Sequence, residues 1–251
     1  MTSLLRIVFA LAFALLFFRN AHAAKVDTIV CSSSCMHKNI KSVIIVPEGR
    51  GKRPLPVLYL LHGAGGSYTD WLKNVPEILV LSQQYGLIIV CPDGNKTSWY
   101  LDSPVDSTYR YETFITKELV PFVDSHYQTI SNVAHRGITG LSMGGFGSFY
   151  LAIRHPDLFG SMGSMSRGLD IRPFPNNWDL PLRLGAYSTS PKNWDRVALP
   201  NFISELSKEH MHIIFDCGED DFFFNVNLSF HTMLNAYNIP HDFIVRSGKH
   251  T

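Results

Sequence analysis

Apolar residues in this chain form short continuous runs, separated by stretches in which apolar residues recur every three or four positions. Short apolar runs bounded by turn residues are typical of buried strands, and the three-and-four spacing is typical of helices. On this basis we expect strands at 26–30, 41–46, 55–61, 87–90, 134–139, 159–165, 211–215 and 241–246. We expect helices at 76–85, 111–123, 146–154, 201–209 and 222–237.

Strands and helices alternate along most of the chain, which predicts a mostly parallel sheet with helices on both faces, an α/β fold. The chain has 251 residues, of which 45% are hydrophobic, and this suits one sizeable domain better than two small ones. The sequence contains no internal repeat, low-complexity tract or interdomain linker. We therefore expect residues 24–251 to form a single domain.

Residues 1–23 have the pattern of a secretory signal peptide. Arg6 precedes an unbroken apolar run over 7–18, and Ala21 and Ala23 frame a small-x-small cleavage site. An apolar run of about twelve residues is too short to span a bilayer. The pattern predicts a secreted or periplasmic protein that is cleaved after Ala23 and has no stable membrane insertion. An uncleaved membrane anchor is the alternative.

The net charge of the chain is small. The formal charge is +1, and removal of Arg6 and Arg19 with the signal peptide leaves 20 basic and 21 acidic residues. Proteins that bind nucleic acids or anionic membranes usually carry a strong basic excess. We therefore expect no nucleic-acid partner. The sequence leaves the oligomeric state open.

The four cysteines show no metal-binding pattern. Cys91 and Cys217 each end an apolar run and are expected to be small buried residues at strand ends. Cys31 and Cys35 are close enough in sequence to pair if the loop allows, and their pairing stays open, although free thiols are favoured. No metal or cofactor is expected.

The most informative motif is Gly140-x-Ser142-x-Gly144, which lies between the expected strand 134–139 and the helix that follows. This is the nucleophile-elbow pattern, in which a serine at a sharp turn is held above the sheet. The strained turn needs glycines on both sides of the serine. The backbone N–H of Met143 would then face the reacting carbonyl oxygen. The alternative is a glycine-rich helix start with a capping serine.

A second glycine-rich turn, 62–66, follows the buried strand 55–61. A turn of this kind can cradle a phosphate, but this one lacks both the Gly-x-Gly-x-x-Gly spacing and the Gly-Lys-Ser/Thr ending. In hydrolases, the segment His-Gly-x after a central strand supplies the second N–H of an oxyanion hole. Ala64 is the candidate donor.

A nucleophilic serine needs a base and a group that orients the base. In α/β-hydrolases the chain order is serine, then an acid, then histidine. The best candidate for the base is His250, after the final expected strand, while His62 comes too early in this order. The candidates for the acid follow the strand 211–215: Asp216, Glu219, Asp220 and Asp221. The other histidines after Ser142 are expected to be structural or surface residues: His155, His210, His212, His231 and His241.

Two segments are candidates for the substrate cleft. Residues 95–108 are polar and aromatic, and they follow the carboxyl end of a strand, where α/β proteins bind ligands. Trp99 and Tyr100 in this segment are candidates for the cleft wall, with packing in the core as the alternative. Residues 170–195 are rich in Pro, Asn and Trp and are expected to form an insertion over the sheet.

These motifs stand beside other characteristic stretches: 59–63 (Tyr-Leu-Leu-His-Gly), 92–94 (Pro-Asp-Gly), 98–100 (Ser-Trp-Tyr), 111–114 (Tyr-Glu-Thr-Phe), 140–145 (Gly-Leu-Ser-Met-Gly-Gly), 155–159 (His-Pro-Asp-Leu-Phe), 216–218 (Asp-Cys-Gly) and 248–250 (Gly-Lys-His). Together they make the chain resemble the putative-esterase family of α/β-hydrolases. That family includes S-formylglutathione hydrolases, feruloyl and acetyl xylan esterases, and mycolyltransferases. The resemblance implies an α/β-hydrolase fold with Ser142 as nucleophile, Asp221 as acid and His250 as base.

The secretory, Trp-rich chain is most similar to the carbohydrate-esterase members. We therefore expect a secreted serine esterase that acts on acetyl or feruloyl esters of plant polysaccharide or oligosaccharide. The alternatives are a thioesterase similar to S-formylglutathione hydrolase, an acyltransferase to a sugar or lipid alcohol, and a non-catalytic carbohydrate-binding protein. Family members continue past the base histidine with a Trp-containing segment and a closing helix. The resemblance implies that the C-terminal helix is missing here, and we expect this form to be a weak esterase. The alternative is that the segment is dispensable.

Export of the protein should remove residues 1–23. N-terminal sequencing of the exported protein should begin at Ala24, because the apolar run ends before the cleavage site at Ala21-His22-Ala23. A retained Met1 would instead support a membrane anchor.

Overall fold

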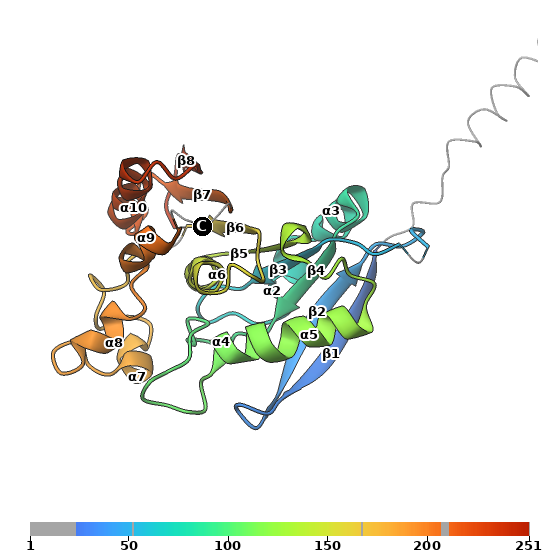
Figure 1. Ribbon diagram of the computed structural model, residues 1–251, viewed down its shortest axis with the longest axis horizontal. Coiled ribbons are helices and arrows are strands. Elements are labelled where there is room, and N and C mark those ends of the chain that lie inside the picture. The colour runs from blue at the N-terminus through green and yellow to red at the C-terminus, as the bar shows by residue number, and fades with distance from the viewer. Residues whose placement is uncertain (1–23, 52, 167, 207–210, 251) are drawn as a thin grey trace, which may run out of the picture.

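An eight-stranded sheet organises the protein. The computed structural model describes residues 24–51, 53–166, 168–206 and 211–250, so the expected signal peptide lies outside the described residues. The strands are β1 (Lys25–Ser33), β2 (Lys38–Val46), β3 (Val57–Leu61), β4 (Ile88–Pro92), β5 (Arg136–Gly140), β6 (Ser161–Met165), β7 (His212–Gly218) and β8 (Asp242–Arg246). Their order in the sheet is β1-β2-β4-β3-β5-β6-β7-β8 (Figure 1).

The sheet is mostly parallel, as the sequence predicts. Only the pairs β1–β2 and β2–β4 are antiparallel, and all strands from β4 to β8 are paired in parallel. The order of strands in the sheet places β3 beside β5 in the centre, with Leu61 opposite Gly140. The segments that follow these two strands therefore leave the same edge of the sheet side by side, as expected at the carboxyl ends of parallel strands.

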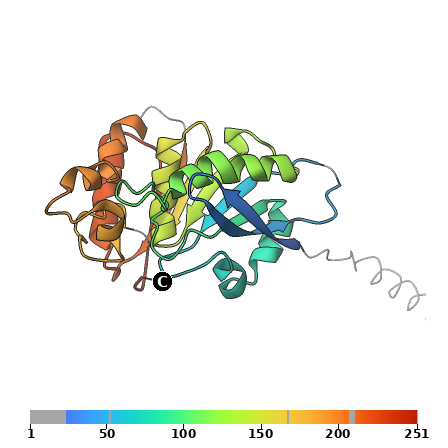
Figure 2. The same ribbon diagram turned by 90° about the horizontal axis from the view of Figure 1, so that it is seen from below.

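One face of the sheet carries the main core. It is covered by α4 (Tyr111–Thr113), η1 (Phe114–Leu119), α5 (Val120–His126), α6 (Met143–Arg154) and α10 (Phe224–Ala236) (Figures 1 and 2). Edge-to-face contacts join Phe149 of α6 to Phe215 of β7 and to Phe230 of α10. Aromatic pairs in this geometry add to the free energy gained from burial.

The expected helix 111–123 is divided into three pieces, because η1 is a π-helix between α4 and α5. Pro121 lies in the first turn of α5 and cannot donate a backbone hydrogen bond, which removes one bond from the preceding turn. A wider turn of this kind is not visible in a pattern of apolar spacing.

The opposite face is covered over only part of its width. The helices α2 (Asp70–Asn74) and α3 (Ile78–Tyr85) pack on β2, β3 and β4. The sequence pattern did not predict α2, which has five residues and none of them buried. No helix in the described part of the chain is both long and apolar enough to cross a membrane.

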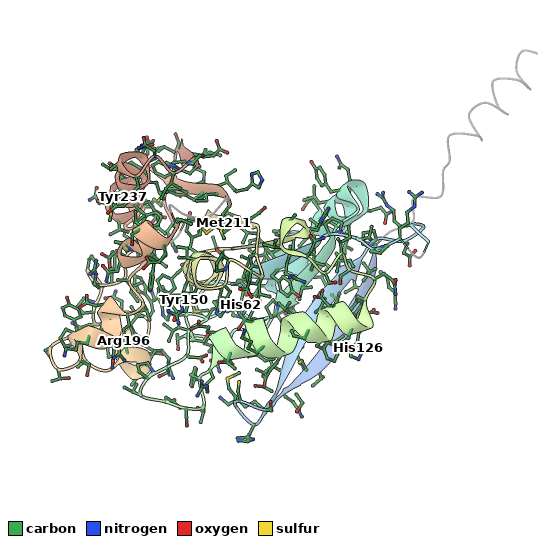
Figure 3. The ribbon with its side chains drawn as sticks, viewed as in Figure 1. His62, His126, Tyr150, Arg196, Met211 and Tyr237 are labelled. Carbon is green, nitrogen blue, oxygen red and sulfur yellow. The ribbon has the colours of Figure 1, made fainter. Side chains whose placement is uncertain are left out.

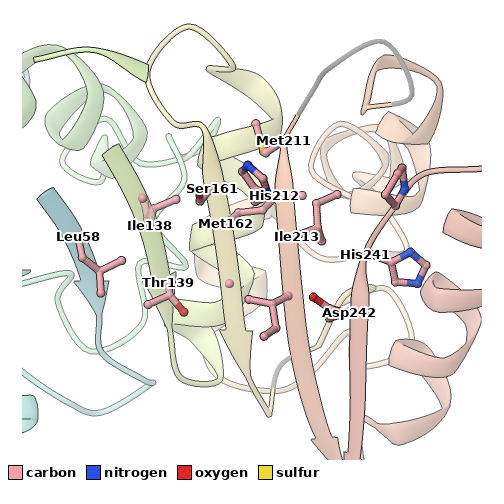
Figure 4. A pocket seen from close by; sticks show the side chains of 14 residues that line it. Leu58, Ile138, Thr139, Ser161, Met162, Met211, His212, Ile213, His241 and Asp242 are labelled. Atoms are coloured by element: carbon pink, nitrogen blue, oxygen red, sulfur yellow. The ribbon is translucent and has the colours of Figure 1, made fainter. Parts of the chain in front are cut away.

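Over β5 to β8 this second face has a pocket of about 700 Å³ in place of a described helix (Figure 4). Leu58, Thr139 and Ile214 line it from the strands, and Ile244 on β8 is also half exposed. The prediction of helices on both faces therefore holds over β2 to β4, and among the described residues it does not extend over β5 to β8.

The segment after β6 contains short helices: α7 (Leu180–Leu184), α8 (Pro191–Asp195), η3 (Leu199–Phe202) and α9 (Ile203–Leu206). It packs against residues 95–110. Ser103 donates a hydrogen bond to the carbonyl of Arg183, and the Arg183 guanidinium pairs with Asp106 and lies 3.5 Å from the centre of the Tyr109 ring. The expected insertion and the expected cleft segment thus pack against each other.

All four cysteines are free thiols. Cys91 and Cys217 are buried at the ends of β4 and β7, as predicted. The Cys35 thiol lies against the carboxylate of Glu118, 3.5 Å away, and Cys31 is buried in the core. Burial, together with the negative charge of Glu118, raises the pKa of the Cys31 thiol.

A buried carboxylate ties α4 to the end of α6. Glu112 accepts hydrogen bonds from Tyr150 Oη at 2.8 Å, Arg154 Nε at 2.8 Å and His155 Nε2 at 2.9 Å. Burial alone would raise the pKa of Glu112, but the bonds from His155, Arg154 and Tyr150 outweigh it and hold the pKa at about 2. The ionised carboxylate therefore fixes the helix that begins at the elbow.

Replacing Glu112 with glutamine should lower the free energy of unfolding by about 2 kcal/mol at pH 7, because the buried side chain at this position loses the charge that strengthens its hydrogen bonds. The pKa of Glu112 is lowered on folding, so its contribution is fully present above the usual value of 4.5 and is lost as the pH falls toward 2. Urea denaturation of both proteins should show a difference that narrows across this range. Glu77→Gln, at an exposed position, is the control. A difference that does not change with pH would contradict the assignment.

Candidate active site

Ser142 lies at a strained turn between β5 and α6. Its φ is 54° and its ψ is −116°, a conformation that non-glycine residues rarely adopt. A Cβ atom on Gly144 would collide with the carbonyl of Leu61, and one on Gly140 would collide with the backbone of Gly144. The strand, turn and helix predicted for the elbow are confirmed. The turn places the Ser142 hydroxyl at the edge of the sheet.

Ser142, His250 and Asp221 form one hydrogen-bonded chain. Ser142 Oγ is 2.9 Å from His250 Nε2, and His250 Nδ1 is 2.9 Å from Asp221 Oδ2. The Asp221 side chain is fully buried. A carboxylate only accepts, so Nδ1 carries the proton and Nε2 accepts the hydrogen bond from the serine. The structure therefore brings together the three residues that chain order and family resemblance indicate.

The other candidate acids have different surroundings. Asp216 pairs with Arg246, and Glu219 and Asp220 are exposed. Most of the other histidines are structural or exposed, as expected: His155 bonds to Glu112, His231 bonds to His241, and His212 is exposed. The remaining one, His210, lies outside the described residues.

Two backbone contacts bring the acid and the base together at the ends of β7 and β8. Glu219 N donates to Arg246 O at 2.9 Å, and Asp220 N donates to Gly248 O at 3.0 Å. A side chain on Gly218 would collide with Gly248 O. Asp221 Oδ1 accepts a hydrogen bond from Phe223 N at 2.8 Å, which leaves Oδ2 for the histidine.

The turn after β3 passes directly beside the serine. A Cβ atom on Gly63 would lie 3.6 Å from Ser142 Cβ. Among the described residues the Ala64 N–H has no protein acceptor, and the Met143 N–H is the first of α6, where helices leave amides unpaired. Both amides are therefore available to an oxygen bound beside Ser142, as the sequence predicts for an oxyanion hole.

His62 fixes this turn, and it lies buried near the centre of the molecule (Figure 3). Its Nδ1 donates to Gly63 O at 2.8 Å, and its Nε2 accepts from Gly94 N at 2.8 Å. Desolvation lowers the pKa of His62, which keeps the ring neutral and preserves the acceptor nitrogen. Tyr100 Oη donates a hydrogen bond to the carbonyl of His62 at 3.1 Å.

The prediction that Trp99 and Tyr100 line the cleft is wrong, and the core-packing alternative is correct. Their side chains are 1% and 0% exposed. Tyr100 packs so closely against Gly94 and Gly147 that any side chain there would collide with its ring. Trp99 Nε1 donates to the carbonyl of Trp178 at 3.2 Å, so these residues support the site from inside the protein.

The aromatic surface beside the histidine is formed instead by Trp178 and Phe222. Their rings stack with centres 5.7 Å apart and planes 26° apart, and Phe222 is 51% exposed. Trp178 lies in the segment 170–195 that was expected to form part of the cleft. Phe222 directly follows Asp221, and this position was the available signal in the sequence.

Comparison with known proteins places the chain in a family. A profile of the family described as "Putative esterase" matches residues 33–238, which is most of the chain. The chain belongs to the putative-esterase family. A solved structure named ferulic acid esterase is similar over 91% of each chain, with 27% identity and a TM-score of 0.77.

Three curated relatives match over shorter regions. A diacylglycerol acyltransferase/mycolyltransferase Ag85A of Mycobacterium gordonae is 34% identical over 58% of this chain and 43% of its own. An acetyl esterase of Caldicellulosiruptor saccharolyticus is 33% identical over 55% of this chain and 54% of its own. An esterase of Mycobacterium tuberculosis is 34% identical over 48% of this chain and 27% of its own length, so the chain matches between 27% and 54% of the length of these three relatives. No group of three His, Cys, Asp or Glu side chains in the described ranges could hold a metal ion.

Asp221→Asn should be far more damaging to any reaction at this site than Asp220→Asn. Asparagine at position 221 cannot hold the Nδ1–H tautomer, and the same change in a serine protease costs roughly 10⁴ in kcat. Asp220 is exposed and contributes its backbone N–H, which the control variant keeps. Esterase assays on both variants test this, and equal losses would move the orienting role away from Asp221.

Proposed function

We propose that this protein is a carboxylic ester hydrolase in which Ser142, His250 and Asp221 are the catalytic residues. The observation that carries the proposal is the continuous hydrogen-bonded chain from Ser142 Oγ through the imidazole to a buried carboxylate, with 2.9 Å at each step. The serine at the start of this hydrogen-bonded series lies at a strained nucleophile elbow. Membership of the putative-esterase family supports the same function.

In the proposed reaction, Ser142 Oγ attacks the ester carbonyl carbon while His250 Nε2 accepts the hydroxyl proton. Collapse of the tetrahedral intermediate breaks the bond to the leaving alcohol, which receives that proton from His250. Water then attacks the acyl-enzyme, again losing a proton to Nε2. Release of the acid returns the proton to Ser142. Asp221 stabilises the imidazolium that forms twice in this cycle.

The N–H groups of Ala64 and Met143 are the proposed donors to the oxyanion. Removing one such donor costs about 3–4 kcal/mol of transition-state stabilisation in comparable sites. The His62 ring fixes the Gly63 carbonyl, which belongs to the same peptide group as the Ala64 N–H. The direction of the donor is therefore set before substrate binds.

The proposed substrates are acetyl or feruloyl esters of plant polysaccharide or oligosaccharide. Similarity to a ferulic acid esterase over 91% of both chains and to an acetyl esterase supports this class. The stacked rings of Trp178 and Phe222 beside His250 suit a flat sugar or hydroxycinnamoyl ring. Export with cleavage after Ala23 is part of the same proposal, since such substrates are extracellular.

Acyl transfer to a sugar or lipid alcohol is the second candidate. The similarity to a mycolyltransferase favours it, and the chemistry differs only in the acceptor that replaces water. A thioesterase similar to S-formylglutathione hydrolase and a non-catalytic carbohydrate-binding protein are further outcomes of the same test.

The test is a substrate panel of an aryl acetate, methyl ferulate, acetylated xylan and S-formylglutathione, each with and without a sugar alcohol acceptor. The wild-type protein should release acetate or ferulate. Ser142→Ala should reduce kcat by up to about 10⁶ while the melting temperature stays the same. Ser131→Ala is the matched control, because Ser131 is exposed and precedes the start of β5, whereas Ser142 follows the end of that strand. Substantial activity in Ser142→Ala would mean that the nucleophile is misassigned, and transfer to the added alcohol would favour the second candidate.

A further inference from the structure

The backbone holds His250 only indirectly. In the described part of its loop, the last backbone anchor is the hydrogen bond from Asp220 N to Gly248 O. Among the described residues, Lys249 and His250 make no backbone hydrogen bond to another residue. The position of the imidazole therefore depends on contacts of the side chain itself.

The two hydrogen bonds of the imidazole leave one motion unrestrained. Both bonds lie near the plane of the ring, one at Nδ1 and one at Nε2. Together they fix two points on the ring. They do not by themselves prevent the ring from tilting about the line that joins the two nitrogens. A contact on the face of the ring is needed to remove that motion.

Phe222 makes that contact. Its ring centre is 4.4 Å from the centre of the His250 imidazole, with the planes 37° apart. Phe223 approaches from 5.4 Å at 72°, which places an edge against the ring. The Phe222 and Phe223 ring centres are themselves only 4.4 Å apart, so both rings contact the imidazole from the same side, Phe222 with a tilted face and Phe223 with an edge.

Phe222 is itself held in place by other aromatic residues. It stacks on Trp178, whose backbone has a left-handed φ of 49° and whose carbonyl accepts a hydrogen bond from buried Trp99. Because the Phe222 side chain is 51% exposed, burial in a core does not account for its position. The contacts run from the interior through Trp178 to Phe222 and end on the imidazole.

We propose that Phe222 is a positioning residue for the base: its ring holds the His250 imidazole in the orientation that joins Ser142 to Asp221. This inference rests on the proposed function, since it assigns a role within the same reaction. Small misplacements of catalytic groups can cost up to about 10²-fold in rate. Loss of one restraint on one ring should cost less than this limit.

The experiment compares Phe222→Leu, Phe222→Tyr and Phe174→Leu with the wild-type protein. The substrate is an aliphatic acetate, which offers no aromatic ring to stack on the Trp178–Phe222 surface. Phe174 belongs to the same aromatic group and contacts Trp178, Phe222 and Phe223, but its ring makes no contact with His250. Phe174→Leu therefore controls for a general loss of aromatic packing.

Phe222→Leu should lower kcat about 10-fold and leave KM within about twofold, because binding of the small ester does not involve the lost ring. Phe222→Tyr keeps the ring and should retain kcat within about twofold. Phe174→Leu should stay close to the wild-type protein. Equal kcat values in Phe222→Leu and wild type, or equal losses in Phe222→Leu and Phe174→Leu, would overturn the inference.

A second measurement separates this inference from the proposed function. The rate at which a fluorophosphonate labels Ser142, followed by mass spectrometry, depends on proton removal by His250 without requiring ester turnover. Slower labelling in Phe222→Leu with no ester hydrolysis by wild type would support the positioning role and reject the proposed hydrolase activity. No labelling and no turnover in wild type would reject both. Should Phe222→Leu fail to keep the wild-type melting temperature, Phe222→Met is measured in its place.

Discussion

The site depends on how closely the start of α6 packs against the end of β3. The Leu61 carbonyl accepts hydrogen bonds from Leu141 N at 3.2 Å and from Trp71 Nε1 at 3.1 Å, and Gly144 lies so near that a Cβ atom would collide with it. This contact sets the distance between the nucleophile turn and the 62–66 turn. The serine and both proposed oxyanion donors therefore move as one unit.

The interior residues His62 and Tyr100, which lie next to this contact, are polar. They can be buried because their polar atoms form hydrogen bonds and neither side chain is charged. His62 uses both ring nitrogens in hydrogen bonds to the backbone, and Tyr100 bonds to the His62 carbonyl. Burial holds the pKa of the histidine down and raises that of the tyrosine, so neither group carries charge near neutral pH. A buried polar network of this kind favours one arrangement of the turn over others.

The sequence was sufficient to predict the order of the strands along the chain and the elbow, because each of these leaves a local mark. Chain order indicated Ser142 and His250, whereas the choice of Asp221 among four candidate acids came from the family resemblance. Glycine is required wherever the backbone of another strand comes close, and short apolar runs mark strands buried on both faces. The side-chain environment of Trp99 and Tyr100 left no such mark. Whether an aromatic residue after a strand lines a cleft or fills the core depends on what the distant segment 170–195 places over it.

Because apolar spacing records only local structure, it also missed other features that the structure shows. The split of the expected helix 111–123 reflects one proline and a π-helical turn, and apolar spacing does not record either. Helix α2 has no buried residue and so produces no periodic signal. The incomplete cover over β5 to β8 concerns contacts between elements far apart in the chain. Local patterns predict elements, whereas tertiary contacts decide which of their faces are covered.

The three residues of the proposed triad follow strands at different positions in the sheet. Ser142 follows central β5, whereas Asp221 and His250 follow β7 and β8, with β8 at the edge. Edge elements with half-exposed residues such as Ile244 and Val245 open at lower free energy than central strands. A transient separation of β8 would remove the proton acceptor while leaving the nucleophile and its turn folded. If β8 opens in this way, heat inactivation would begin below the temperature of global unfolding and would report on the stability of the edge strand.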